Sequence, residues 1–195
     1  TTKSAIWRLS PEKVLGTRAQ WANRYPEQLA ALIRALTRAA RWCGDPDNLS
    51  ALAEILARDD RLGLPADLLL RPLSGRLLFG PGEEHEVKEF FVPFQRAANF
   101  PWISHAMWFY SQMVRWRQVE HTPDNAANAR ASYRPDLFRA ALAGQGIAVP
   151  SANAKVEGAL SEPTVVGAAG GTLTLGPDGF FDGTRFDPDK LDDYI

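Results

Sequence analysis

Apolar residues recur at helical spacing along much of the chain, and this pattern predicts a helix-rich protein. The clearest stripe lies in a helix that opens at Pro26 and ends at Gly44. Its expected buried residues are Leu29, Leu32, Ile33, Leu36 and Ala40. Asp45 and Pro46 then supply an N-cap and a first-turn proline for a second helix. We expect the two helices to form a helical hairpin, in which the second helix buries Leu49, Leu52, Ala53 and Leu56.

Other stretches predict shorter elements. Helices are expected over residues 66–70, from Ser104 as N-cap to about Val119, and over 136–142. Residues 14–17 (Val-Leu-Gly-Thr) predict a buried strand, residues 71–82 a turn-rich stretch and residues 87–94 an extended apolar segment. The small residues beyond Pro150 predict a segment that wraps the surface, and residues 173–186 predict small hairpins.

These elements leave the strands without partners. Unpaired backbone groups in a lone strand are costly when they are buried. The chain also begins Thr1-Thr2-Lys3, without a methionine. We therefore expect the chain to be part of a longer protein, whose preceding segment supplies the sheets.

Composition narrows the function classes. The chain has 195 residues, is 45% hydrophobic and carries a net charge of -1. The chain has no excess of basic residues that would favour direct nucleic-acid binding, and its apolar runs are too short to cross a bilayer. Cys43 is the only cysteine, which excludes an internal disulfide and a multi-cysteine metal site. The first residues do not have the pattern of a signal peptide, and because we expect a fragment the compartment stays open.

Catalytic and metal-binding patterns are weak. The only histidines are His85, His105 and His121, and none accompanies a Gly-x-Ser-x-Gly nucleophile elbow. The acidic residues around His85 favour a solvated loop over a metal site. We therefore expect neither catalytic residues nor metal ligands, and His105 is expected to satisfy a backbone group inside an aromatic core. Arg71 and Arg76 lie beside glycines where they could face an anion, although a surface role is favoured.

Glu12 and Lys13 are the more informative pair. They enter the predicted strand directly after an aromatic segment that contains Trp7. A lysine at the end of a buried strand can bind a small anion as a point charge, and a neighbouring carboxylate can orient it or bind a cation. In a regular strand the two side chains would point to opposite sides, so both reach one site only if the proline turn breaks the alternation. From spacing alone, a surface lysine is the favoured interpretation of Lys13.

The chain resembles the substrate-binding proteins of nitrate and bicarbonate ABC transporters, a group that includes a cytoplasmic nitrate or nitrite sensor branch. An ordered set of motifs that covers essentially the whole chain carries this resemblance. It starts with Trp7, then Pro11-Glu12-Lys13-Val14-Leu15-Gly16 and Trp21. It continues with Arg41-Trp42-Cys43, Asp45-Pro46-Asp47-Asn48, Gly75-Arg76-Leu77, Phe100-Pro101-Trp102-Ile103-Ser104-His105, Tyr133-Arg134-Pro135-Asp136-Leu137 and Phe180-Phe181-Asp182-Gly183.

The resemblance implies an α/β fold of the second periplasmic-binding-protein type, with two lobes in the whole protein and this chain as a helix-rich C-terminal portion. Residues 1–24 would end the second lobe and carry the anion contacts. Residues 25–150 would form the helical remainder of that lobe and return to the first lobe, and residues 151–195 would wrap the surface with small hairpins. By resemblance, Lys13 contacts the anion and Glu12 lies beside it, with Arg76 and Trp7 as further possible contacts. Many relatives have a basic residue where this chain has Ile103.

The function implied is reversible binding of nitrate or nitrite as the solute receptor of an ABC importer, without a cofactor and without enzymatic activity. Its partners would be an ABC permease and an ATPase. One alternative is a cytoplasmic nitrate or nitrite sensor that sequesters an RNA-binding antiterminator. The other is a bicarbonate receptor, in which Glu12 helps to hold calcium. The importer would be periplasmic or membrane-anchored, and the sensor would be cytoplasmic.

Overall fold

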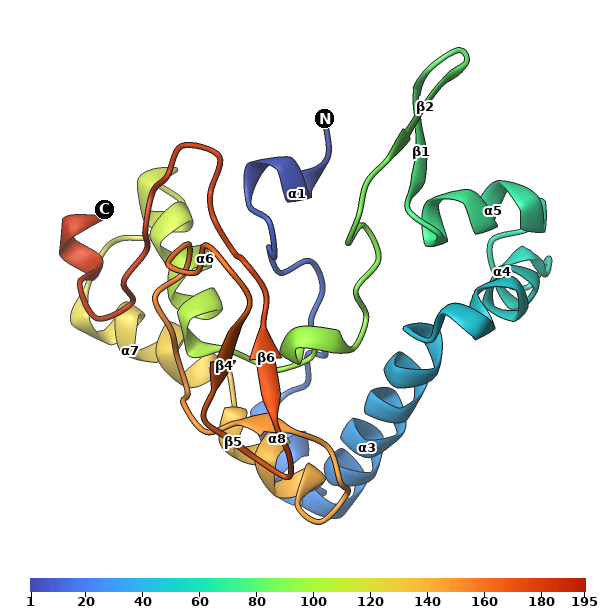
Figure 1. The fold of residues 1–195 in the computed structure, drawn as a ribbon. Helices are drawn as coiled ribbons and strands as arrows, with labels where there is room; N and C mark the ends of the chain where they lie inside the picture. Colours follow the sequence, from blue (N-terminus) through green and yellow to red (C-terminus); the bar gives the residue numbers. More distant parts are fainter.

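The longest helix, α3 (Pro26–Cys43), connects the two parts of the computed structural model, which describes all 195 residues. Its first half packs against α8 (Pro135–Leu142). Its other end leads through a 3-10 turn, η1 (Pro46–Asn48), to α4 (Leu49–Ala57). Figure 1 shows an arm, residues 26–86, that diverges from a lobe formed by residues 98–195. The start and end predicted for α3 are confirmed, and Asp45 caps η1 by accepting a bond from the backbone N–H of Asp47.

The arm continues with α5 (Ala66–Leu73) and an antiparallel hairpin of β1 (Arg76–Gly80) and β2 (Glu83–Glu86). α4 packs against α5 and not back along α3, so the predicted helical hairpin is wrong. Residues 71–82, predicted to be rich in turns, contain turns at residues 74–75 and 81–82, but the apolar run after Arg76 forms β1. Gly82, with φ +78°, occupies the turn between the two strands.

Few side chains of the arm are buried. In α3 only Leu29 and Thr37 are, whereas Leu32 and Leu36 are exposed. The predicted apolar stripe is therefore present in the sequence, but most of it has no covering element in this chain. Leu52 and Ala53 of α4 are buried as predicted, and α5 has no buried residue.

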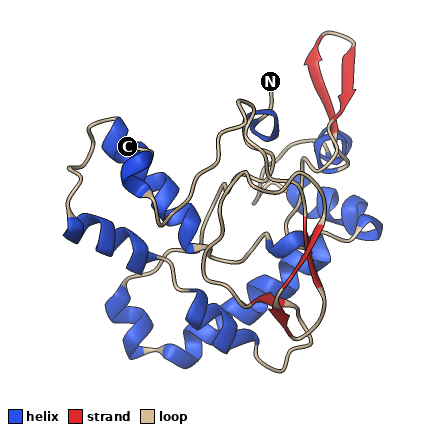
Figure 2. Ribbon diagram, turned by 60° about the vertical axis from the view of Figure 1, so that its left-hand side comes forward, coloured by secondary structure: helices blue, strands red, loops and turns tan.

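The lobe is built around α6 (Ile103–Arg115), α7 (Pro123–Ser132) and α8, with irregular chain crossing them. Its strands form two antiparallel pairs, β3 (Val149–Pro150) with β5 (Ala168–Ala169) and β4 (Thr164–Val166) with β6 (Leu173–Leu175). Figure 2 shows that none of the three strand pairs joins another into a larger sheet. Residues 173–186 thus pair with residues 157–166 and with Trp7, and not within themselves as predicted.

Two apolar clusters fill the lobe. The first consists of Phe100, Trp102, Leu142, Val149, Leu173 and Leu175. The second consists of Met107, Tyr110, Phe186 and Leu191, the last of which lies in a 3-10 turn, η3 (Leu191–Asp193). The core role predicted for the aromatic helix holds for Met107 and Tyr110, whereas Phe109, Met113 and Trp116 are exposed. The helix nevertheless ends at Arg115 and not near Val119, because Arg117 adopts a left-handed conformation with φ +58°.

The predicted strand at residues 14–17 is absent. These residues lie between two short helices, α1 (Lys3–Ile6) and α2 (Ala19–Arg24), in a segment without regular secondary structure. Val14 is 62% exposed and Leu15 is 50% exposed, since no strand of this chain lies beside them. None of the helices has both the length and the hydrophobicity to cross a membrane.

Candidate functional site

Trp7 anchors the N-terminal segment to the lobe. Its side chain is buried, with ring centroids 4.6 Å from Phe180 in a stacked arrangement and 4.8 Å from Trp108. Backbone bonds reinforce this contact, because the N–H of Arg8 donates to Gly179 and the N–H of Phe181 donates to Ile6. The chain that leaves Trp7 therefore starts from a fixed point on the lobe.

Glu12 and Lys13 lie in the exposed loop that follows this anchor. The Lys13 ammonium is 3.8 Å from one carboxylate oxygen of Glu12, and Lys3 is 3.6 Å from the other. Lys13 is 90% exposed and has no other ion pair. The regular strand that would separate Glu12 from Lys13 does not form, so the two side chains lie together at the surface.

Arg76 lies apart from this pair. It begins β1 in the arm, where its Nε is 3.5 Å from the Ser74 hydroxyl, and no hydrogen bond or ion pair connects it to Glu12 or Lys13. The structure thus brings Lys13 together with Glu12, and places Trp7 at the root of the same segment. Arg76 is not brought to them within this chain.

Beneath Trp7 lies a buried polar cluster that the sequence did not predict. His105 contacts Trp7 edge-on at 5.8 Å, and its Nε2 is 3.4 Å from Oε1 of Glu157. The Ser104 hydroxyl donates to the same carboxylate oxygen at 2.6 Å. Ser104 therefore binds Glu157 instead of capping α6, whose N-cap is Trp102. His105 interacts with a carboxylate and not with the backbone group that we expected.

Lys155 completes this cluster. Its ammonium forms ion pairs with both Glu157 and Asp178, and the second Asp178 oxygen accepts a bond from the Leu160 N–H at 2.9 Å. Burial raises the pKa of Glu157, but the interaction with His105 and the charge of Lys155 outweigh burial, so that the net shift is downward. The one signal in the sequence was two isolated charges, Lys155 and Glu157, in a stretch of small residues.

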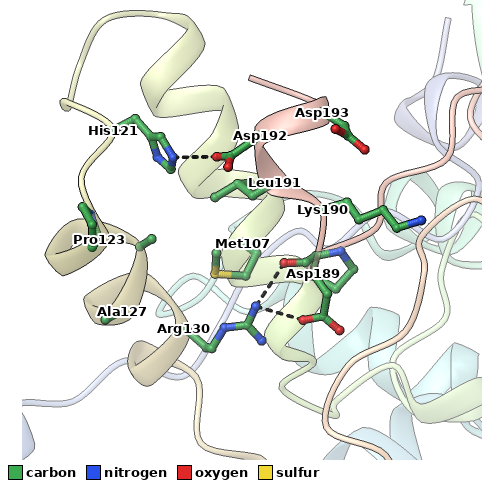
Figure 3. Close-up of a pocket in the computed structure, with 12 residues that line it drawn as sticks. Met107, His121, Pro123, Ala127, Arg130, Asp189, Lys190, Leu191, Asp192 and Asp193 are labelled. Carbon is green, nitrogen blue, oxygen red and sulfur yellow. Dashed lines mark hydrogen bonds and ion pairs between the residues drawn. The ribbon is translucent and has the colours of Figure 1, made fainter.

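A cleft of about 550 Å³ lies elsewhere on the lobe, between α7 and the last residues of the chain. Figure 3 shows how its walls are tied together: His121 Nε2 lies 3.0 Å from Asp192, and Arg130 lies 3.1 Å from Asp189. Its lining residues are Met107, His121, Pro123, Ala126, Ala127, Arg130, Pro188, Asp189, Lys190, Leu191, Asp192 and Asp193. His121 and Arg130 pair with carboxylates of the same cleft, and Lys190 lies 3.9 Å from Asp187 beside it.

No cluster of three or more His, Cys, Asp or Glu side chains in the chain is arranged to hold a metal ion. Glu12 illustrates the difficulty for calcium. Both of its oxygens face lysine ammonium groups. A calcium ion would have to displace these lysines, and it would also need several further oxygen ligands. The residues of this chain alone therefore do not fit a calcium site.

Comparisons with known proteins agree with this fold. The crystal structure of the periplasmic nitrate-binding protein NrtA from Synechocystis PCC 6803 matches 98% of this chain and 46% of its own length, with a TM-score of 0.77 and 27% identity. The chain is thus part of a type II periplasmic-binding-protein-like fold. Residues 1–57 match the NMT1-like family.

The sequence relatives include binding proteins for small oxyanions. The nitrate/nitrite binding protein NrtA of Synechococcus elongatus is 29% identical over 97% of this chain and 39% of its own length. The bicarbonate-binding protein CmpA of that organism is also 29% identical, over 97% of this chain and 40% of its own length. The chain is therefore similar to substrate-binding proteins for nitrate and for bicarbonate, and it spans about two fifths of these relatives. A shorter stretch, 68% of the chain, is 30% identical to the nitrate import ATP-binding protein NrtC of Synechocystis, of which it covers 20%.

Proposed function

We propose that this chain is part of a receptor that binds a small oxyanion, nitrate or nitrite, and delivers it to an ABC importer. The relatives named above are binding proteins for nitrate, nitrite or bicarbonate, and one is the ATP-binding protein of a nitrate importer. Binding is reversible and no bond is made or broken. Closure of two lobes on the anion would report that the site is occupied.

The observation that carries the proposal is the exposed Lys13 on a segment rooted at Trp7. An ammonium group with one distant partner can exchange Glu12 for an anion at little cost, since exposed ion pairs contribute about 0–1 kcal/mol. The buried Trp7 limits how far the segment can move. Lys13 is proposed as the charged contact and Glu12 as its neighbour, while Trp7 serves as the anchor.

Arg76 would contribute only if the arm approaches Lys13 when the lobes close. In this arrangement residues 1–24 end the second lobe and carry the contacts, residues 25–150 lead back to the first lobe, and residues 151–195 brace the lobe surface. The brace consists of the Lys155, Glu157 and Asp178 cluster that reaches Trp7 through His105.

Bicarbonate is the second candidate ligand, because CmpA is as similar to this chain as NrtA is. Any calcium at Glu12 would need most of its ligands from outside this chain. The sensor function with an antiterminator partner has no support beyond the resemblance. The match to part of an ATP-binding importer protein favours transport.

Titration calorimetry of the full natural protein with nitrate, nitrite and bicarbonate tests the proposal, each with and without calcium. We expect heat of binding for nitrate or nitrite without calcium, and no loss of that affinity in Glu12→Gln. The second candidate would be established if bicarbonate binds and nitrate and nitrite do not, if this binding requires calcium, and if Glu12→Gln abolishes it. Absence of binding for all three anions would contradict an oxyanion receptor.

A further inference from the structure

Residues 87–97 connect the arm to the lobe, and their side chains contact both. Figure 1 shows this connection running from β2 of the arm to the lobe, where it ends beside β6 in a short turn, η2 (Gln95–Ala97). The side-chain nitrogen of Gln95 donates to the carbonyl of Gly44 at 2.8 Å, at the end of α3. The connection is therefore tied to the arm close to the point where it reaches the lobe.

Arg96 ties the same connection to the lobe. Its side chain lies on the backbone of Gly176, directly after β6, where an added Cβ would come within 2.6 Å of Nη1 and 2.8 Å of Cδ of the arginine. The close approach requires glycine at this position, because a side chain there would displace Arg96. Arg96 itself has φ +59°, a left-handed conformation that residues other than glycine adopt at a cost and keep only when their surroundings hold them.

Glu89 joins Arg96 to the N-terminal segment. One of its carboxylate oxygens lies 2.5 Å from Nη1 of Arg96, an ion pair without the alignment of a hydrogen bond, and the other lies 3.5 Å from Nε of Arg8. The Glu89 side chain is 21% exposed, and its φ of +64° is also left-handed. Neither arginine has another ion pair. Without this carboxylate, two guanidinium groups would face each other with no anion between them.

Arg8 begins the segment that leads to Lys13. It follows the buried Trp7, and Ser10 closes a turn there by donating its backbone N–H to the Trp7 carbonyl. Beyond Ser10, no hydrogen bond between backbone groups holds the segment before Arg18. The direction in which the chain continues to Lys13 is therefore set by the part of the segment that ends at this turn, and the Arg8 side chain is the charged contact of that part.

We propose that Glu89 is a positioning residue for the anion contact, which fixes Arg8 and, through Arg8, the direction in which Lys13 leaves the lobe. Glu89 does not touch the anion, and its negative charge is required because it holds two arginines at once. The inference rests on the proposed role of Lys13. It adds that the arm, through Gln95, and the lobe, through Arg96, both act on the position of that lysine.

Hydrogen exchange by mass spectrometry on the full natural protein, without an anion, tests whether Glu89 holds the segment. In Glu89→Gln the hydrogen-bonded amides of Arg8 and Ser10 should exchange about two- to fivefold faster, the factor that corresponds to a partly exposed ion pair. Amides of α6 in the core of the lobe should keep their wild-type rates. The matched control is Glu54→Gln, at an exposed glutamate of α4, which should change neither. Unchanged exchange at Arg8 and Ser10, or equal acceleration in α6, would overturn the proposal.

Nitrate calorimetry on the same proteins tests the link to the anion. Glu89→Gln and Arg8→Gln should each weaken nitrate binding about two- to fivefold, and the double variant should bind no more weakly than either, because both residues act through one contact. A further loss on adding Arg8→Gln to Glu89→Gln would show that Arg8 touches the anion itself and would overturn the positioning role. If the wild type binds no anion, the proposed function fails together with the link to Lys13, and the exchange rates alone show whether Glu89 holds the segment.

Discussion

Glu157 has the most demanding environment of any carboxylate in the chain. It is fully buried, yet it keeps its charge because Lys155, His105 and the Ser104 hydroxyl surround its two oxygens. Removing one member of a buried ion pair leaves the other uncompensated, which costs about 3–5 kcal/mol. Here Asp178 still pairs with Lys155, so the lower end of that range applies.

We therefore predict that Glu157→Gln lowers the free energy of unfolding by about 3 kcal/mol at pH 7. The folded state lowers the pKa of Glu157, so its contribution is present above the pKa of the unfolded chain, about 4.3, and is lost as the pH falls through the folded value. Urea unfolding from pH 7 to pH 3 should show the difference between the two proteins shrinking toward low pH. The control is Glu162→Gln, at an exposed glutamate. An equal effect of both variants would contradict the role given to the cluster.

The contact between residues 157–158 and residues 180–186 fixes how the last segment of the chain crosses the lobe. Gly158 has φ +79°, and a Cβ there would lie 2.6 Å from the Thr184 carbonyl oxygen and 2.7 Å from the Phe180 ring. Phe180 is the residue on which Trp7 stacks. The close packing of Gly158 against Phe180 therefore supports the ring on which Trp7, the anchor of the candidate site, is stacked.

For this reason Gly158→Ala should destabilise the protein by more than about 1 kcal/mol and weaken the Trp7 stack. Thermal unfolding and near-ultraviolet circular dichroism, which reports on aromatic packing, would measure both effects. Gly179→Ala is the matched control, because an added Cβ there meets no atom within 4 Å and its φ is not left-handed. Similar losses in the two variants would show that the close approach is not what matters.

At the level of elements, the sequence predicted the helix boundaries that capping residues, proline and glycine determine locally. Pro26, Gly44 and the Asp45-Pro46 pair mark helix boundaries by capping and backbone geometry, and the structure follows them. Partner choice could not be predicted in this way. α4 packs on α5, and β6 pairs with β4, and these pairings depend on tertiary packing and not on capping or turn residues.

In the candidate site, too, the local motif could be predicted from the sequence and the contacts between separate segments could not. The motif that carries Glu12 and Lys13 was visible in the sequence, and in the structure their charged groups lie 3.8 Å apart. Their role stays a prediction. The Glu157 cluster was not visible, because its members come from α6 and from two separate parts of the last segment. The strand predicted from Val14 and Leu15 does not form, because this chain offers no neighbouring strand with which it could pair.

At the scale of the whole molecule, an arm with little buried surface extends from a lobe that has its own core. Such a chain matches a two-lobed binding protein of which it covers less than half. Closure of two lobes requires that anion contacts come from both. We propose that Lys13 is the contact that this chain contributes.

The most direct test of that claim is nitrate calorimetry on the full natural protein with Lys13→Ala, compared with Lys190→Ala at an exposed lysine that lines the cleft of Figure 3. A hydrogen bond to a charged group contributes about 1.5–3 kcal/mol, so we expect Lys13→Ala to weaken nitrate binding about tenfold or more. Lys190→Ala should leave the affinity unchanged. Equal nitrate affinity in the wild type and in Lys13→Ala would contradict the assignment.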